Sequence, residues 1–493
     1  METGVIQFAL NGQLQKLDQA DPNLSILTWL RTKMRLTATK EGCGSGDCGA
    51  CTVIMGTPDP SGDMRYEAVN SCIALIGSLH GRHLITLEAF QQTPCHPVQQ
   101  AMIEQHASQC GFCTPGIVMS LIALHAHQAG QPAPRPAVLE ALSGNLCRCT
   151  GYRPIVAAGQ QAMVQQWQPD TPGHPARGLA DPARDPILTV DSSGDACLAP
   201  PSGARFDAPA SLAALIELRR RHPRAQLVAG STDLALNITQ GLARFEHLIS
   251  VSRVPELRGC QVEDGALVIG AATTFTELRA PLSQYWPAFD GLLERLGSLQ
   301  IRNRGTLGGN IGNASPIGDM PPALIALGAT LVLNGPDGER RLPLESFFLG
   351  YKNTDLRPGE FIHSVRLPLP AADTRLFIYK VSKRLDDDIS AVLGAFHLTV
   401  SDGRVSDCRL AYGGMAATPA RARQAESALR GQAWTETTVA AAVAALDQDF
   451  SPLSDVRASA EYRRRVAGNL LRRALAASRP DERNQPLTVT DYA

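Results

Sequence analysis

Cys43-Gly-Ser-Gly-Asp-Cys48-Gly-Ala-Cys51 is the stretch that decides the N-terminal fold, and Cys72 follows it after 20 further residues. Cys-x4-Cys-x2-Cys with a distant fourth cysteine is the spacing of a plant-type [2Fe–2S] site. The cysteines are interleaved with Gly42, Gly44, Gly46 and Gly49. Glycines permit positive φ and let backbone N–H groups approach the sulfurs. This first quartet (Cys43, Cys48, Cys51 and Cys72) is therefore predicted to bind a [2Fe–2S] cluster.

Two other interpretations fit this loop less well. Structural zinc sites normally pair two Cys-x2–4-Cys hooks, whereas three closely spaced cysteines stand here. Gly44-x-Gly46-x-x-Gly49 matches the dinucleotide-binding fingerprint. That fingerprint follows a strand and opens a helix, but helical residues precede it here and cysteines crowd it.

The residues around the loop predict a small β-rich fold. Val5–Leu10 and Gln13–Leu17 flank Asn11-Gly12, a pair typical of a two-residue hairpin turn. Asp21-Pro22 then supplies an N-cap and a proline at the first helical position, which predicts the start of a helix. Thr52–Met55 is the next expected strand.

A second quartet is formed by Cys110-Gly-Phe-Cys113 and, after 33 residues, Cys147-Arg-Cys149. Apolar periodicity predicts helices over residues 97–108, 116–128 and 136–142, so these cysteines fall at helix ends. Two opposed pairs suit structural zinc and a [2Fe–2S] cluster equally well on spacing alone. The neighbouring ferredoxin-like loop favours a second [2Fe–2S] cluster.

Length and composition limit the possible classes of protein. A chain of 493 residues suggests about three domains at roughly 100–200 residues each. Its 46 Lys+Arg and 47 Asp+Glu nearly cancel, which argues against a nucleic-acid partner. No apolar run reaches the roughly 18 residues of a membrane span. Met1–Val5 lacks the features of an export signal, so a cytoplasmic location is expected.

Several strings of this sequence resemble the xanthine oxidase family of molybdenum hydroxylases. EGCGSGDCGACTV (41–53), QCGFCTPG (109–116) and GNLCRCTGYRPI (144–155) are similar to the paired [2Fe–2S] domains of that family. LVAGSTDLAL (227–236), residues 301–329 and KVSKRLDDDISAV (380–392) resemble its FAD domain. The resemblance implies two [2Fe–2S] clusters and FAD as cofactors.

Two glycine-dense stretches are the candidate flavin-binding loops. Gly230-Ser-Thr-Asp233 follows a short apolar strand, and Gly305-Thr-Leu-Gly-Gly-Asn310 lies further along the chain. Loops of small residues expose backbone N–H groups to a pyrophosphate, although the first is also an ordinary strand-to-helix turn by itself. The family resemblance extends the FAD contacts to Leu227, Val228, Ala229, Gly230, Ser231, Thr232, Asp233, Leu234, Thr306, Leu307, Gly308, Gly309, Asn310, Asp319, Ile362 and Lys380.

Individual residues of this set have simpler alternatives. Asp319 suits hydrogen bonds from ribityl or ribose hydroxyls but also the N-cap of a helix. Lys380 suits the stabilisation of reduced flavin but also a solvated strand-end cation. Leu296 stands where eukaryotic members place an aromatic ring near the isoalloxazine, and Ser382–Asp388 resembles a segment that controls access to the flavin.

The expected fold class is multidomain α+β, with four domains and a linker. We expect a β-grasp, plant-ferredoxin-like [2Fe–2S] domain over residues 1–85, a helical-bundle [2Fe–2S] domain over 86–165, a linker over 166–203, an α+β FAD-binding domain over 204–375 and an α+β C-terminal subdomain over 376–493.

The resemblance also implies a function in electron transfer. Both clusters and the flavin share one chain in the small subunits of bacterial xanthine dehydrogenases. Such a subunit passes electrons from the molybdenum centre of a partner through both clusters to FAD and NAD, while hypoxanthine and xanthine become urate. This implies a large molybdenum-cofactor subunit, an α2β2 assembly and no catalytic residue for purine oxidation in this chain.

Two alternatives remain at this point. The same module can serve another molybdenum hydroxylase, acting on an aldehyde or an N-heterocycle. In the other alternative, the quartets bind zinc in a non-enzymatic scaffold.

Overall fold

The computed structural model describes residues 5–59, 63–91, 95–128, 130–167, 174–181, 185, 187 and 192–478. They divide into two compact units whose segments alternate along the chain. The first unit comprises residues 1–257, 274–276 and 297–306, and the second comprises 258–273, 277–296 and 307–493. No helix in the described part of the chain is long and apolar enough to span a membrane.

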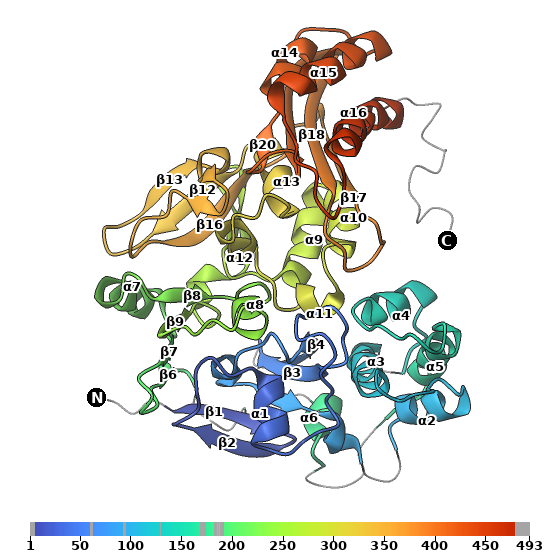
Figure 1. Cartoon of the computed structure of the whole chain (residues 1–493), viewed down its shortest axis with the longest axis vertical. Helices are drawn as coiled ribbons and strands as arrows, with labels where there is room; N and C mark the ends of the chain where they lie inside the picture. The colour runs from blue at the N-terminus through green and yellow to red at the C-terminus, as the bar shows by residue number, and fades with distance from the viewer. Residues whose placement is uncertain are drawn as a thin grey trace. The chain divides into compact units, whose positions relative to one another are not determined.

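A mixed five-stranded sheet forms the first part of the first unit (Figure 1). Its order is β2-β1-β5-β3-β4, built from β1 (Ile6–Leu10), β2 (Gln13–Leu17), β3 (Thr52–Pro58), β4 (Met64–Asn70) and β5 (His83–Ile85). Asn11 and Gly12 have φ of 47° and 78°, the two positive values that a type I′ hairpin turn requires. Phe8 of β1 packs edge-to-face on Trp29 of α1 (Ile26–Thr32), with ring centroids 5.4 Å apart, and both lie in the core.

The first helix begins later than the sequence predicts. Asp21-Pro22 does not open it, because Ser25 is the N-cap of α1 and its hydroxyl accepts from the Thr28 N–H. Asp21 instead accepts a hydrogen bond from the Asn23 N–H and closes a turn. An aspartate before a proline suits both a turn and a helix start, and the local sequence does not separate them.

Four helices form the next part of the first unit, around the second quartet (Figure 1). They are α2 (Pro97–Glu104), α3 (Thr114–Gln128), α4 (Arg135–Leu142) and α5 (Arg153–Met163). The 3-10 helices η1 (Ile76–Leu79) and η2 (Leu87–Phe90) precede them. Ile117, Leu121 and Ile155 are buried where α3 and α5 meet. The predicted helical periodicity therefore corresponds to an apolar bundle core.

Parts of the predicted linker pack against the first unit. Of residues 166–203, positions 168–173, 182–184, 186 and 188–191 lie outside the described residues. The rest includes α6 (Arg177–Ala180) and Asp185, whose carboxylate lies 2.5 Å from His83 Nδ1 and accepts from the Tyr66 hydroxyl. Leu179 and Ile187 join the apolar core of the helical part. The composition of this segment did not reveal that it is anchored.

A small sheet of order β6-β7-β9-β8 completes the first unit. Its elements are β6 (Ala196–Leu198), β7 (Arg205–Ala208), α7 (Leu212–Arg221), β8 (Gln226–Val228), α8 (Leu234–Thr239), β9 (His247–Ser250) and η5 (Pro255–Leu257). Residues 297–306 return to this unit as α11 (Leu299–Arg302), which contacts β4 and α4. A segment distant in sequence therefore completes the packing around both quartets.

The described residues of the second unit form two larger antiparallel sheets and a two-stranded one, β14-β15. The first has the order β10-β11-β16-β12-β13, from β10 (Cys260–Glu263), β11 (Ala266–Gly270), β12 (Thr330–Asn334), β13 (Arg340–Pro343) and β16 (Phe361–Pro368). Beside it lie α9 (Phe275–Tyr285), α10 (Ala288–Glu294), α12 (Leu307–Gly312), α13 (Met320–Ala326), η6 (Leu344–Ser346), β14 (Phe348–Gly350) and β15 (Asn353–Thr354).

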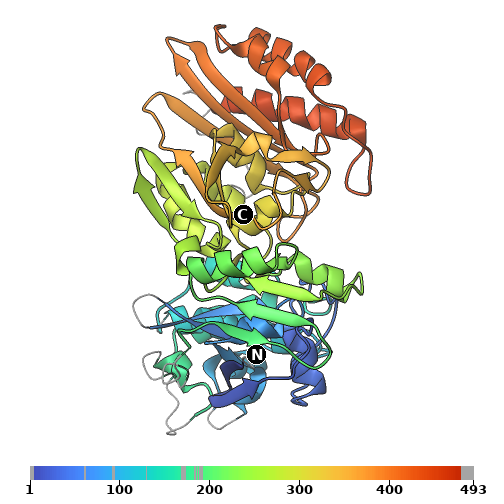
Figure 2. The same ribbon diagram turned by 90° about the vertical axis from the view of Figure 1, so that its left-hand side faces the viewer.

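Three helices cover one face of the second sheet, as Figure 2 shows in orange and red. This sheet has the order β17-β18-β19-β20, from β17 (Thr374–Val381), β18 (Val392–Ser401), β19 (Arg404–Gly413) and β20 (Ala420–Arg421). The covering helices are α14 (Arg423–Leu429), α15 (Glu436–Asp449) and α16 (Ala460–Ala477). Ser459 is the N-cap of α16, and its hydroxyl accepts from the Tyr462 N–H at 3.1 Å. The multidomain α+β prediction is confirmed.

Candidate functional site

Glycines shape the loop that carries the first quartet. Gly44, Gly46 and Gly49 have φ of 66°, 86° and 66°, values that side chains disfavour. Gly42 is required for a different reason, because a Cβ there would lie 2.8 Å from the Cys48 sulfur. The Ser45 N–H points at the Cys43 sulfur over 3.4 Å. The loop therefore wraps tightly around its own thiols.

The four thiols of this loop lie close enough to share protons. The Cys51 and Cys72 sulfurs are 3.2 Å apart, and Cys43 is within hydrogen-bonding reach of Cys48. Hydrogen bonding to Cys72 lowers the pKa of Cys51, while hydrogen bonds to Cys43 and then Cys51 raise the pKa of Cys72. Thiolates this close repel each other unless a metal charge compensates them. This donor set fits a [2Fe–2S] cluster, which takes four thiolates.

The buried side of the first quartet faces the predicted flavin loop. Cys51 and Cys72 share an apolar cluster with Ala235 of α8. Ser231 has a φ of 62°, and its hydroxyl donates to the Ile73 carbonyl over 2.6 Å. Because Ile73 follows Cys72 in the chain, one hydrogen bond connects the first quartet to a predicted FAD-binding residue.

The helices bring the two halves of the second quartet together. Cys110 and Cys113 precede α3, and Cys147 and Cys149 lie between α4 and α5. Burial, and then the hydrogen bond with Cys147, raise the pKa of Cys113 to about 12. Cys149 in turn hydrogen-bonds Cys110, which raises the pKa of Cys149. The donor set again is four thiols in two facing pairs, and it also fits a [2Fe–2S] cluster.

Tyr152 orders the loop of the second quartet. Its φ is 67°, and its hydroxyl accepts from the Cys147 N–H at 2.8 Å and donates to the Asn145 carbonyl at 3.1 Å. The Thr150 hydroxyl lies 3.2 Å from the Cys147 sulfur. Although burial opposes the shift, hydrogen bonding from Thr150 lowers the pKa of Cys147. These contacts favour a thiolate at Cys147.

The surface around the second quartet is apolar and open in this chain. Cys110 and Cys149 are exposed, whereas Cys51 and Cys72 are buried. Phe112 is 47 % exposed and Leu146 51 % exposed, and both lie beside the ligands in sequence. Exposed large apolar side chains next to polar ligands are typical of a surface that another protein covers.

In the first unit, the two glycine-dense stretches meet. A Cβ on Gly230 would overlap the Arg304 carbonyl oxygen and lie 3.1 Å from the Gly305 nitrogen. The first of these loops therefore packs against the stretch that carries Gly305 and Thr306. It contains Gly230, Ser231, Thr232 and Asp233. Leu227 and Val228 end β8, and Leu234 opens α8. This close approach joins two stretches of protein backbone, and the exposure of their N–H groups to a pyrophosphate stays a prediction.

The remaining predicted FAD residues belong to the second unit. Leu307, Gly308, Gly309 and Asn310 form the start of α12, and the Gly308 N–H donates to the Ala271 carbonyl at 2.8 Å. Asn310 Oδ1 is buried and accepts no hydrogen bond from the described residues. Ile362 of β16 lies beside Gly312, where a Cβ would be 3.6 Å from its side chain. The unused acceptor on Asn310 fits a ligand that brings hydroxyl or N–H donors, as FAD does.

Asp319 and Lys380 form a buried ion pair. Lys380 Nζ lies 2.7 Å from Asp319 Oδ2 and donates to the Arg295 carbonyl at 2.9 Å. The Ser390 hydroxyl donates to Asp319 Oδ1 at 2.5 Å. Lys380 is not the solvated cation of the simpler alternative, since its side chain is 3 % exposed. Asp319 does stand at the N-cap of α13, but its side chain makes no capping hydrogen bond.

Arg295 fixes the loop that follows Lys380. Its guanidinium donates to the Lys380 carbonyl at 2.9 Å, to the Ser382 hydroxyl at 2.9 Å and to the Leu385 carbonyl at 3.4 Å. Leu296, next to it, is buried. Sequence reasoning did not single out Arg295, nor the buried amides of Asn145 and Gln300. The available signal was position in the sequence: Asn145 lies within the family-like string 144–155, and Gln300 directly precedes residues 301–329.

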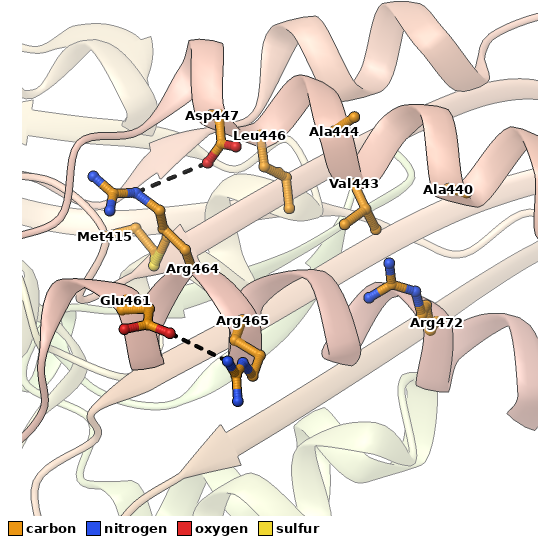
Figure 3. A pocket seen from close by; sticks show the side chains of 10 residues that line it. All are labelled: Met415, Ala440, Val443, Ala444, Leu446, Asp447, Glu461, Arg464, Arg465 and Arg472. Atoms are coloured by element: carbon orange, nitrogen blue, oxygen red, sulfur yellow. Dashed lines mark hydrogen bonds and ion pairs between the residues drawn. The ribbon is translucent and has the colours of Figure 1, made fainter.

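One groove lies apart from all predicted site residues. It holds about 350 Å³ between α15 and α16 in the second unit (Figure 3). Its lining combines Met415, Ala440, Val443, Ala444, Leu446, Asp447, Glu461, Arg464, Arg465 and Arg472. Arg464 pairs with Asp447 at 3.8 Å and Arg465 with Glu461 at 3.2 Å, so most of its charge is compensated internally.

Four domain families match consecutive parts of the chain. Residues 8–77 match the 2Fe-2S iron-sulfur cluster binding domain, and residues 86–160 match the [2Fe-2S] binding domain. Residues 203–370 match the FAD binding domain in molybdopterin dehydrogenase, and residues 377–478 the CO dehydrogenase flavoprotein C-terminal domain. The cofactor prediction of two [2Fe–2S] clusters and FAD is confirmed, and the zinc alternative is overturned.

Relatives that match most of the chain include xanthine dehydrogenases and an aldehyde oxidase. Xanthine dehydrogenase of Emericella nidulans is 34 % identical over 90 % of this chain and 36 % of its own length. Aldehyde oxidase 2 of Cavia porcellus is 34 % identical over 88 % of this chain and 37 % of its own. The chain therefore spans about a third of the length of these relatives.

Solved structures match about half of the chain. Carbon monoxide dehydrogenase from Hydrogenophaga pseudoflava is 35 % identical, with a TM-score of 0.52, over 54 % of this chain and 94 % of that one. Quinoline 2-oxidoreductase from Pseudomonas putida 86 is 28 % identical, with a TM-score of 0.51, over 55 % of this chain and 94 % of that one.

Proposed function

Since this chain belongs to the iron–sulfur/FAD modules of the molybdenum hydroxylase family, we propose that it is the electron-transfer subunit of a xanthine dehydrogenase. In this proposal a partner oxidises hypoxanthine and xanthine to urate at a molybdenum centre. Electrons then pass through the two [2Fe–2S] clusters and FAD of this chain to NAD. Xanthine dehydrogenases of Emericella nidulans and Drosophila pseudoobscura pseudoobscura, which are 34 % and 32 % identical to this chain, support this choice.

The contact between the Ser231 hydroxyl and the Ile73 carbonyl carries the proposal. At 2.6 Å it joins the backbone beside Cys72 to the predicted flavin loop, inside one compact unit. A structural cluster has no need of such proximity to a dinucleotide loop, whereas an electron relay requires it. Flavin supplies the exchange between single electrons and the hydride that NAD accepts.

Each group of residues then has a defined task. We propose that the thiols of Cys43, Cys48, Cys51, Cys72, Cys110, Cys113, Cys147 and Cys149 lose their protons and hold the clusters. Gly230 and Gly305 let their two loops pack closely, and backbone N–H groups of these loops bind the FAD pyrophosphate in this proposal. Asn310 Oδ1 accepts from a flavin donor, and the Asp319–Lys380 pair places a fixed charge beside the predicted contacts. The domain boundaries at 85, 165, 203 and 375 belong to this proposal.

We further propose a large molybdenum-cofactor subunit as the partner, in a cytoplasmic α2β2 assembly. The exposed second quartet and the apolar Phe112 and Leu146 beside it support this site of docking. A partner surface there would exclude water from the ligands and shorten the path to its own cofactor. The chain itself contributes no residue to purine oxidation in this scheme.

A second candidate differs only in the substrate of the partner. Aldehyde oxidase 2 is as similar to this chain as the xanthine dehydrogenases are, and quinoline 2-oxidoreductase shares its flavin-binding fold. The same module can therefore serve a hydroxylase of aldehydes or N-heterocycles.

Purification of the tagged chain with whatever co-purifies tests both candidates. The complex receives NAD and, in parallel, xanthine, an aldehyde or quinoline, while NADH absorbance is followed. NADH formation with xanthine alone supports the proposal, and formation only with another substrate supports the second candidate. Cys43→Ser should stop substrate-to-NAD transfer but leave NADH oxidation by a flavin-accepting dye. Survival of both activities in this variant would contradict the relay.

A further inference from the structure

The loops of the two quartets touch each other directly. The Leu146 N–H donates to the Cys48 carbonyl at 3.0 Å. Cys48 belongs to the first quartet, and Leu146 immediately precedes Cys147 of the second. Cys48 is a predicted ligand of one cluster and Cys147 of the other. The path between them therefore runs through the backbone of Cys48, Leu146 and Cys147 and one hydrogen bond.

Three glycines from three elements permit this contact. A Cβ on Gly116 of α3 would overlap the Gly49 carbonyl oxygen, and one on Gly49 would overlap the Gly144 carbonyl oxygen. A Cβ on Gly49 would also lie 2.9 Å from the Asn145 Cα. Gly49 additionally has a φ of 66°. A side chain at Gly49 or Gly116 would therefore displace the first loop from its neighbours, whereas one at Gly144 would collide with Gln300 and Ser298. The approach of the loops is specified by sequence.

A buried amide holds the loops at this separation. Asn145 Nδ2 donates to the Gly49 carbonyl at 3.1 Å and to the Thr52 hydroxyl at 3.3 Å. Its Oδ1 accepts from the Ser120 hydroxyl at 2.7 Å and from Gln300 Nε2 at 3.0 Å. Asn145, Ser120 and Gln300 are each 2 % exposed or less. All the hydrogen-bonding groups of the Asn145 amide are therefore engaged.

Gln300 ties this contact to the flavin-binding part of the chain. It lies on α11, in the segment 297–306 that returns to the first unit and ends beside Gly230. A buried polar network costs more than apolar packing, and here Gln300 Oε1 is buried without a hydrogen-bond partner among the described residues. The benefit of such a network is fixed geometry. Apolar residues would suffice for cohesion alone, so the network indicates that the separation of the loops matters.

We propose that this interloop junction (Cys48, Gly49, Gly116, Gly144, Asn145 and Leu146) is the electron bridge between the two clusters, with Asn145 and Gln300 as positioning residues. The inference rests on the proposed relay. One electron leaves the centre held by Cys147 and arrives at the centre held by Cys48, with no covalent bond made or broken and no proton moved. Tunnelling weakens steeply with the length of the gap, and one hydrogen bond between backbones keeps that gap short.

Two variants test the junction, each with a matched control. Gly116→Ala drives the loops apart, and Gly159→Ala creates comparable crowding elsewhere in the helical part, where its Cβ would lie 2.7 Å from Val138. Gln300→Met removes the amide from the junction. Gln240→Met removes the hydrogen bond that Gln240 Nε2 donates to the Cys43 carbonyl over 3.0 Å. This bond lies on the first loop but away from the second.

The primary readout is the magnetic coupling between the two clusters in the fully reduced chain, measured by electron paramagnetic resonance. It needs neither partner nor substrate. Iron content and the separate signals of each cluster report whether both are assembled. We expect both junction variants to keep two clusters but to show weaker coupling, and both controls to match the wild type.

The second readout is the rate at which flavin is reduced after substrate is added to the complete complex. We expect this rate to fall severalfold in the junction variants and not in the controls, because tunnelling weakens steeply as the gap between the loops widens. Dye-linked NADH oxidation should be unchanged. Unchanged coupling and unchanged rate in Gln300→Met and Gly116→Ala would overturn the bridge. Absence of transfer in the wild-type complex would instead contradict the proposed function, while the coupling still tests the junction.

Discussion

The two cysteine quartets offer the same four thiols, yet they lie in opposite surroundings. Cys51 and Cys72 are buried under α8 and α11, in a loop bent by three positive-φ glycines. Cys110 and Cys149 are exposed at helix ends. The chemistry of the ligands is thus shared, and their accessibility differs.

The largest expected difference is between Cys72→Ser and Cys149→Ser. Each variant should lose one cluster and about half of the bound iron. Cys72→Ser also places a hydroxyl beside the Cys51 thiol in an apolar cluster, which should cost about a further 1–3 kcal/mol in the free energy of unfolding. Cys149→Ser changes an exposed side chain, so its cost in stability should be no more than that of losing its cluster. Iron assays with thermal unfolding measure both effects, and equal loss of stability in the two variants would contradict the contrast.

A glycine in each loop sharpens the comparison. Gly46 and Gly111 have φ of 86° and 82°, so alanine at either costs about 1–2 kcal/mol in backbone strain. At Gly46 the Cβ would also lie 2.6 Å from Ile73, while at Gly111 nothing lies within 4 Å. Overpacking should add about 1–3 kcal/mol to Gly46→Ala only.

Chemical denaturation of both glycine variants provides the measurement. The midpoint should fall further for Gly46→Ala than for Gly111→Ala. Equal midpoints would mean that the first loop tolerates an added side chain, against the tight packing described above.

Acid should weaken both regions through buried histidines. Burial, and then the charge of Arg253, lower the pKa of His80 in the ferredoxin-like part to about 4. Burial also lowers the pKa of His96, His125 and His174 in the helical part. The unfolded chain binds these protons near pH 6.5 and the folded chain only at lower pH, so stability falls as the pH drops below about 6.5.

His80→Gln isolates one contribution to this acid effect. The glutamine cannot be protonated in this pH range. Between pH 7.5 and pH 5 the free energy of unfolding should therefore fall by about 2 kcal/mol less in the variant than in the wild type. Thermal unfolding at both pH values gives the comparison. A wild-type pH dependence that persists unchanged in the variant would assign the acid sensitivity to the helical part alone.

The smallest expected effect concerns metal removal. With an iron chelator and a mild oxidant, the second cluster of the isolated chain should bleach about fivefold faster than the first, which corresponds to about 1 kcal/mol. The exposure of Cys110 and Cys149 is the reason. Addition of the co-purified partner should slow this phase selectively. Loss of both clusters at one rate would contradict the difference in accessibility.

Local sequence predicted the parts of the fold that depend on local chemistry. Asn11-Gly12 and the glycines of the first loop act through their own backbone, and their positive φ values agree with the sequence analysis. Asp21-Pro22 did not open a helix because turn and helix start share the same residues. Nothing in the local pattern predicts that Asp185 reaches His83 across 102 positions.

The candidate site shows the same division. Cysteine spacing and resemblance predicted the ligand sets and the flavin stretches. They did not predict the Asp319–Lys380 ion pair or the hydrogen bonds of Arg295, because these join residues 61 and 85 positions apart. The role of Asn145 depends on Gln300, which is 155 positions away. Long-range pairs of polar side chains leave no periodic signal.

The return of residues 297–306 to the first unit has a consequence for synthesis of the protein. Cys149 leaves the ribosome about 150 residues before Gln300, a delay of roughly 8–30 s at 5–20 residues per second. During that interval all eight cysteines are outside, but the segment that covers the contact between their loops is still being made. A nascent chain therefore exposes both sets of ligands together before its first unit can close.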